Sequence, residues 1–313
     1  MPENVDIYRT QSRWSDPGRW ASLLSEIRPE PAEIVRAVSG LLMHPFIAPA
    51  RGVEMPAAAA DDRELRSVEA ILDRVRARDQ RPFTAARAPA HRCFCVCAGF
   101  ARVATAVFRA HGEPARCRVG FARYFNPGFL EDHWVCEYRD GGEWRLLDAQ
   151  LDDASVRELG LGFSSCDMPR DQFLDGSTAW RRMRAGELDP GRMGLSVLGL
   201  TGAWFAAGNV MLDVAALNKE ELLPWEKWSV GREQGPGHDP GPEWAARFDE
   251  VAALLGGSPD AALAQRVYRD HEWLRVTPSI LSFANGPPVE IRIGSDTSLP
   301  PPPPPPMTQR WGD

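Results

Sequence analysis

The spacing of apolar residues changes its period twice along the chain, and this change limits the possible folds more than any other feature. Between residues 115 and 151, the segments ARCRVGFARYF, HWVCEYRD and EWRLLDAQL alternate in the way half-buried strands do. Asp140-Gly141-Gly142 is a hairpin signal between the last two segments. Helical periodicity precedes and follows this block. The sequence therefore predicts an α+β fold and not alternating βαβ units.

Helices are predicted on both sides of the strands. Ser15-Asp16-Pro17-Gly18 has the polar cap and the proline of a first helical turn. Helical spacing then runs through residues 19–27, 32–44 and 57–79, and returns after residue 160 at 175–187, 202–222, 243–256 and 260–274. Residues 231–242 are rich in glycine and proline and predict a surface loop, and residues 287–293 predict a late strand. The seven prolines at 300–306 favour polyproline II over a packed element.

Charge and composition exclude several classes of function. The 313 residues carry a formal net charge of -7, which argues against a broad nucleic-acid-binding surface. No stretch approaches the roughly 18 consecutive apolar residues of a membrane span. The N-terminal segment MPENVDIYRTQSRW lacks the apolar region of a secretory signal. We therefore expect no membrane contact and a cytoplasmic protein, with reduced cysteines at positions 93, 95, 97, 117, 136 and 166.

Three residues of the central block suggest thiol chemistry. Cys97 lies where the segment CFCV gives way to the apolar helix predicted for 97–110, and the amides of a helix N-terminus favour a thiolate. Such a thiolate also needs a histidine that is oriented by a carboxylate or amide. His133 opens one predicted strand, and Asp148 lies near the end of the next strand, across the hairpin. Antiparallel neighbours can bring these side chains together.

Four ordered motifs resemble the transglutaminase-like superfamily, whose core is related to papain. They are Cys97-Ala-Gly-Phe-Ala, the turn from Arg109 to Arg116, His133-Trp-Val-x-Glu-Tyr, and Trp144-Arg-Leu-Leu-Asp148. The resemblance implies a catalytic helix packed on an antiparallel sheet and a Cys97–His133–Asp148 triad. Its register selects Cys97 over Cys93 and Cys95. One departure is that family members commonly carry Arg-Asp where this chain has Ala98-Gly99.

The resemblance also implies a domain plan and a reaction class. Residues 86–160 would be the catalytic core, between a helical region at 1–85 and a mainly helical region at 161–298 packed on the core. A disordered tail would follow at 299–313. The enzyme would form a thioester at Cys97 and pass the acyl group to water or to an amine, without a cofactor. The substrate would be an acyl or amide compound: a small molecule, a peptide or a protein side chain. We also expect the two helical regions, which are rich in apolar residues, to narrow the cleft. The alternative function is a catalytically inert module that binds a peptide.

The other candidate residues have either two possible roles or a purely structural one. Asp132 is either a second charge near the site or a turn residue, and Trp134 is either a wall of the cleft or part of the core. His91, Cys93, Cys95 and Cys97 could be zinc ligands, but their alternate spacing strains a chelate, so we predict no metal. Cys117 and Cys136 read as buried strand residues and Cys166 as a loop thiol. The remaining histidines are expected at helix ends or on the surface: His44, His111, His238 and His271.

Overall fold

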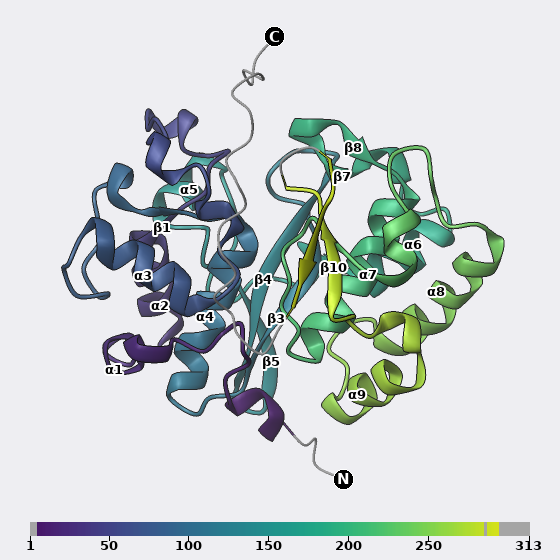
Figure 1. Cartoon of the computed structure of the whole chain (residues 1–313), viewed down its shortest axis with the longest axis horizontal. Coiled ribbons are helices and arrows are strands. Elements are labelled where there is room, and N and C mark those ends of the chain that lie inside the picture. Colours follow the sequence, from purple (N-terminus) through teal and green to yellow (C-terminus); the bar gives the residue numbers. More distant parts are fainter. Residues whose placement is uncertain (1–4, 285–286, 294–313) are drawn as a thin grey trace.

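The computed structural model describes residues 5–284 and 287–293, and the chain is an α+β protein. Its largest sheet has the strand order β6-β3-β4-β7-β8, and β5 also pairs with β4. Figure 1 shows β3 and β4 between the N-terminal helices on one side and the C-terminal helices on the other. The strands of this sheet are β3 (Ala115–Ala122), β4 (Leu130–Asp140), β5 (Glu143–Leu147), β6 (Phe173–Asp175), β7 (Met193–Leu195) and β8 (Leu200–Thr201).

The predicted hairpin forms at the expected place. Strands β4 and β5 pair antiparallel from Cys136↔Leu147 to Asp140↔Glu143. Gly141 and Gly142 between them adopt φ angles of 56° and 90°, a left-handed turn that glycine tolerates. Strand β4 begins at Leu130, three residues before the predicted start. Asp132 is consequently a strand residue and not a turn residue.

Helix α4 (Cys97–Ala110) is the central helix of the fold. Every residue from Cys97 to Arg109 is buried, because the sheet covers one side of α4 and other helices cover the opposite side. Helices α2 (Pro31–Leu41) and α3 (Val68–Arg78) pack against it from the N-terminal part. The helix ends at Ala110, and Gly112 two residues later has a φ of 73°, while a bond from the Glu113 amide to the Phe108 carbonyl closes the last turn.

The segment before α3 differs from the predicted long helix at 57–79. Only 68–78 is α-helical, and Ser67 caps its start by accepting a hydrogen bond from the Ala70 amide. The buried carboxylate of Asp62 explains the break. It accepts hydrogen bonds from the Phe94 amide (2.8 Å) and from Arg78, which hold residues 57–66 away from the helix axis.

The C-terminal helices pack on β3, the first two directly and the last two through them. These helices are α6 (Gly176–Arg184), α7 (Ala203–Leu217), α8 (Pro242–Leu255) and α9 (Ala261–Asp270). The carboxylate of Asp213 on α7 accepts a bond from the Val119 amide (2.8 Å) at the edge of β3. It also accepts two bonds of 2.9 Å from the guanidinium of Arg118. This buried pair fixes α7 against the sheet.

The remaining elements are short. The late strand predicted at 287–293 is present as β11, in a small sheet ordered β11-β10-β9. Among the described residues, no helix is long and apolar enough to cross a membrane. The proline-rich tail predicted at 299–313 lies outside the described residues. The remaining bounds are α1 (Ala21–Leu24), α5 (Asp153–Glu158), β1 (Leu42–Met43), β2 (Cys93–Phe94), β9 (Glu226–Lys227), β10 (Ser279–Ser282) and β11 (Val289–Arg292).

Candidate active site

The three residues of the predicted triad come together at the N-terminal end of α4. Cys97 is the first residue of this helix, His133 lies in β4, and Asp148 follows directly after β5. Nε2 of His133 is 2.9 Å from Oδ2 of Asp148. The thiol of Cys97 lies close enough to the same imidazole for the two groups to shift each other's pKa. Because Nε2 faces Asp148, Nδ1 is the ring nitrogen left for the thiol.

Asp148 is held by bonds to both of its carboxylate oxygens. The hydroxyl of Tyr124 donates to Oδ2 (2.7 Å), and the amide of Gln150 donates to Oδ1 (2.9 Å). The Asp148 amide in turn donates to the Ser165 carbonyl (2.8 Å). With its side chain almost fully buried, the carboxylate has one fixed orientation toward His133.

His133 is enclosed by aromatic rings and tuned by its neighbour. The ring centroids of Phe125 and Tyr124 lie 4.9 Å and 6.0 Å from that of His133, both edge-on. Burial lowers the pKa of His133, but the charge and hydrogen bond of Asp148 outweigh it and, together with Cys97, raise this pKa to about 10. Asp148 therefore favours keeping the proton shared by the Cys97–His133 pair on the imidazole.

The electrostatics of Cys97 differ from the sequence expectation. We expected the helix N-terminus and a histidine to lower the pKa of this thiol. Burial instead raises the pKa of Cys97, and the neighbouring His133 with its charge only partly opposes this rise. The thiol thus depends on the basicity of His133 for its ionisation.

No side chain among the described residues caps the amides at the start of α4. Its N-cap residue, Val96, makes no side-chain capping bond, and residues 97–99 include no acid. The departure at Ala98-Gly99 also has a packing reason. A Cβ added at Gly99 would lie 2.7 Å from Cβ of Cys95, and Ala98 is fully buried, so neither position has room for a longer side chain.

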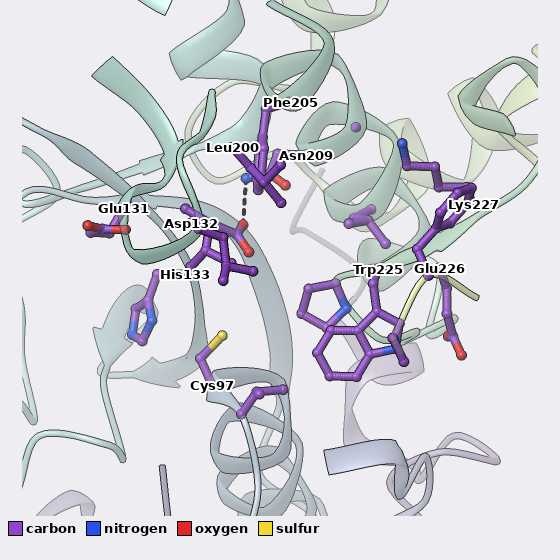
Figure 2. A pocket seen from close by; sticks show the side chains of 18 of the residues that line it. Cys97, Glu131, Asp132, His133, Leu200, Phe205, Asn209, Trp225, Glu226 and Lys227 are labelled. Atoms are coloured by element: carbon purple, nitrogen blue, oxygen red, sulfur yellow. Dashed lines mark hydrogen bonds between the residues drawn. The ribbon is translucent and has the colours of Figure 1, made fainter. Parts of the chain in front are cut away.

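A cavity of about 710 Å³ opens over Cys97. Figure 2 shows the thiol at the start of α4, with Asp132 and His133 of β4 to one side and Trp225 facing it across the space. Much of the wall comes from the C-terminal region, through residues 195–212 and 224–236. Apolar and aromatic side chains dominate this part of the wall, including Leu200, Trp204, Phe205, Met211, Leu212 and Trp225.

Of the two residues predicted to line the cleft, only Asp132 does so. Asp132 lines the cavity, where its Oδ1 accepts a bond from Nδ2 of Asn209 at 2.9 Å (Figure 2). Trp134 does not: its side chain is 1% exposed and packs in the main core with Ala101 and Cys117. Two residues apart, Asp132 and Trp134 point to the same face of β4, and they differ because burial increases from the start of the strand toward its centre. Trp134 is therefore a core residue and the prediction that it lines the cleft is corrected.

Sequence reasoning missed several side chains of the cavity. Gln150, Asn209 and Trp225 line it from three separate segments, and only spatial folding brings them together. His44 was expected at a helix end or on the surface, yet it lines the same cavity and is half-buried. Burial, and secondarily the charge of His133, lowers the pKa of His44 to about 3, so its imidazole is neutral. Its Nδ1 accepts a bond from the Phe46 amide at 3.3 Å.

The other cysteines and histidines lie apart from the triad. All six cysteines are free thiols. The hydroxyl of Thr105 lies 3.4 Å from the sulfurs of both Cys117 and Cys136 in the core, while Cys166 is half-buried. The zinc alternative does not fit, since no three or more His, Cys, Asp or Glu side chains within the described ranges are arranged to hold a metal ion. Two of the other histidines lie at helix ends, as expected: His111 follows α4 and His271 follows α9. His238, in the predicted surface loop, is exposed at the cavity rim.

Comparison with known proteins gives one distant match. No family model matches the chain, and no curated protein matches it significantly. A solved structure described as "a Putative Cysteine Protease from Cytophaga hutchinsonii" matches with 17% sequence identity and a TM-score of 0.32. The match covers 55% of this chain and 45% of that protein, so the chain spans less than half of that protein's length. A similarity this distant assigns no family to the chain.

Proposed function

We propose that the chain is a thiol acyl-transfer enzyme with a transglutaminase-like, papain-related core. The observation that carries the proposal is the arrangement of Cys97, His133 and Asp148. A thiol at the start of a buried helix lies beside an imidazole that influences its pKa, and that imidazole is held by a carboxylate 2.9 Å away. These are the parts that nucleophilic catalysis by a cysteine requires. The cavity over the thiol supplies room for an acyl donor.

The first half of the reaction forms a thioester. The sulfur of Cys97 attacks the carbonyl carbon of an amide, and Nδ1 of His133 holds the proton of the thiol. When the carbon–nitrogen bond breaks, His133 passes this proton to the leaving amine. The raised pKa of His133 favours the imidazolium form that must give the proton, and Asp148 stabilises this cation.

The start of α4 would stabilise the negative oxygen of the tetrahedral intermediate. The amide of Cys97 belongs to the first turn of a helix without a side-chain cap, so no protein acceptor of that kind competes for it. In the second half of the reaction, water or an amine attacks the thioester. The same three residues serve both outcomes, with His133 taking a proton from the attacking molecule.

Alkylation of single cysteines tests the proposal. The protein is treated with iodoacetamide at neutral pH and the modified residue is identified by mass spectrometry. We expect selective labelling of Cys97, slowed at least tenfold in His133→Ala. Cys95→Ser is the matched control, because Cys95 is buried two residues away and its sulfur lies 3.6 Å from that of Cys93. Slow labelling of several cysteines, unaffected by His133→Ala, would instead support the inert peptide-binding module.

Turnover distinguishes hydrolysis from transfer. Acyl adducts on Cys97 are trapped by rapid acid quenching after mixing with a panel of amide donors, with and without added primary amines. An amine product that forms faster than the acid product identifies a transferase. Acid product alone identifies a hydrolase. The absence of any adduct from reactive thioester donors would contradict both.

A further inference from the structure

Asp132 places a carboxylate in the cavity beside the proposed nucleophile. Its Oδ1 is fixed by Nδ2 of Asn209, which also donates to the Gly120 carbonyl at 3.0 Å and is therefore held in one orientation. Within residues 5–284 and 287–293, Asp132 forms no ion pair with an arginine or a lysine. In the view of Figure 2 the carboxylate lies between the Asn209 amide and the Cys97 thiol.

A negative charge at this position opposes thiolate formation. Burial is the main cause that raises the pKa of Cys97, and the charge of Asp132 raises it further. Burial also raises the pKa of Asp132, to about 6, so the group is largely ionised at neutral pH. A site that only had to hold a thiolate would gain nothing from this carboxylate. A cation bound to Asp132 would offset the unfavourable effect of its charge on the Cys97 thiolate.

We propose that Asp132 binds a protonated amine of the acyl donor. The substrate class is then acyl donors that carry an ammonium group next to the reactive carbonyl, as an N-terminal aminoacyl group does. This inference rests on the proposed function and specifies its substrate. The ammonium donates to Oδ2 of Asp132, neutralises the carboxylate and so favours the Cys97 thiolate only when a substrate is present.

Other side chains of the cavity fit the same ligand. Gln150 is 8% exposed, and its Oε1 is buried without a hydrogen-bond partner among the described residues, which provides a second acceptor for an amine. Lys227 does not neutralise Asp132, because its amine donates to the Gln234 carbonyl and lies 4.7 Å from the ring of Trp204. Phe205 and Trp225 supply an apolar wall for the side chain of the acyl group.

Two matched alkylating reagents test this inference. The chloromethyl ketone of phenylalanine carries a free ammonium group, and 1-chloro-4-phenylbutan-2-one is the same molecule without it. In both, the sulfur of Cys97 displaces chloride, a thioether bond forms, and His133 keeps the thiol proton. We expect the wild-type protein to react with the amine-bearing reagent roughly 10- to 100-fold faster. In Asp132→Asn this ratio falls to about 1.

A gain in the reactivity of Cys97 distinguishes substrate binding by Asp132 from a role of Asp132 in holding the fold. Asp132→Asn removes the neighbouring negative charge, so its Cys97 should react faster than wild type with neutral iodoacetamide, whereas a damaged fold would label several cysteines. Glu131→Gln is the matched charge control and keeps the amine preference, because the Glu131 carboxylate is bound to Ser196. Equal rates with both reagents in wild type, or an unchanged ratio in Asp132→Asn, would overturn the inference. Labelling of Cys97 that does not depend on His133 would overturn the proposed function instead.

Discussion

Replacing Asp148 by asparagine is the sharpest test of how the site works. Oδ1 of Asp148 accepts the Gln150 amide, and Oδ2 faces both His133 and the Tyr124 hydroxyl. An asparagine that keeps the Gln150 bond must turn its NH2 group toward Nε2 of His133. That nitrogen then becomes an acceptor, and the imidazole proton moves to Nδ1, where the thiol needs an acceptor instead.

This change of imidazole tautomer determines how much rate is lost in Asp148→Asn. A carboxylate-to-amide change in a triad of this geometry costs roughly 10³- to 10⁴-fold in rate, or about 4–5 kcal/mol of transition-state stabilisation. The pKa of His133, about 10 in the native site, should also fall toward its ordinary 6.5. The alkaline limb of the pH–rate profile, which reports loss of the imidazolium, should therefore move to lower pH.

The assay is acyl-adduct formation on Cys97 across a pH series, with stability followed by thermal unfolding. Asp152→Asn is the control, because it makes the same chemical change four residues away. Asp152 caps α5 through the Ser155 amide and pairs with Arg51, outside the triad. A rate for Asp148→Asn above a tenth of wild type, with the alkaline limb unmoved, would refute the assigned role of the carboxylate.

Three further changes have defined outcomes. Tyr124→Phe loses the 2.7 Å bond to Asp148 and should lower the acylation rate roughly tenfold in the same adduct assay, with the fold kept. Gly99→Ala should lower the free energy of unfolding by about 1–3 kcal/mol in urea titration, because its Cβ would meet Cβ of Cys95 at 2.7 Å. The folded-state pKa of His133 lies above its ordinary value, so its charge stabilises the fold fully below about pH 6.5. This stabilisation should fade by about pH 10, and Asp148→Asn should flatten the dependence.

The central part of the fold could be predicted because local rules decide it. The apolar run from Cys97 ends at a glycine in the left-handed region, and the two glycines after Asp140 form the tight turn. These signals depend on neighbouring residues alone. They led us to expect His133 in one strand and Asp148 near the end of the next, and the structure has His133 in β4 and Asp148 directly after β5.

Tertiary partners decided the features that sequence reasoning missed. Residues 57–66 have helical periodicity, but the buried Asp62 serves Arg78 and Phe94 across the fold and breaks the helix. Nothing near Asp132 in the sequence indicates that Asn209, 77 residues later, will hold it in the cavity. The rise in the pKa of Cys97 has the same origin, because the depth of burial is set by the elements that close over the helix.

The division of the cavity wall suggests how reactivity and selectivity are separated in this chain. The groups that we propose to react come from α4, β4 and the residue after β5, and the hairpin fixes their relative positions. The rest of the cavity wall comes largely from residues 195–212 and 224–236, the first of which begins 48 residues after the end of β5. The buried pair of Arg118 and Asp213 ties these two parts together. Under the proposed function, changes in the later segment can therefore alter which acyl donor fits while the thiol, the imidazole and the carboxylate keep their geometry.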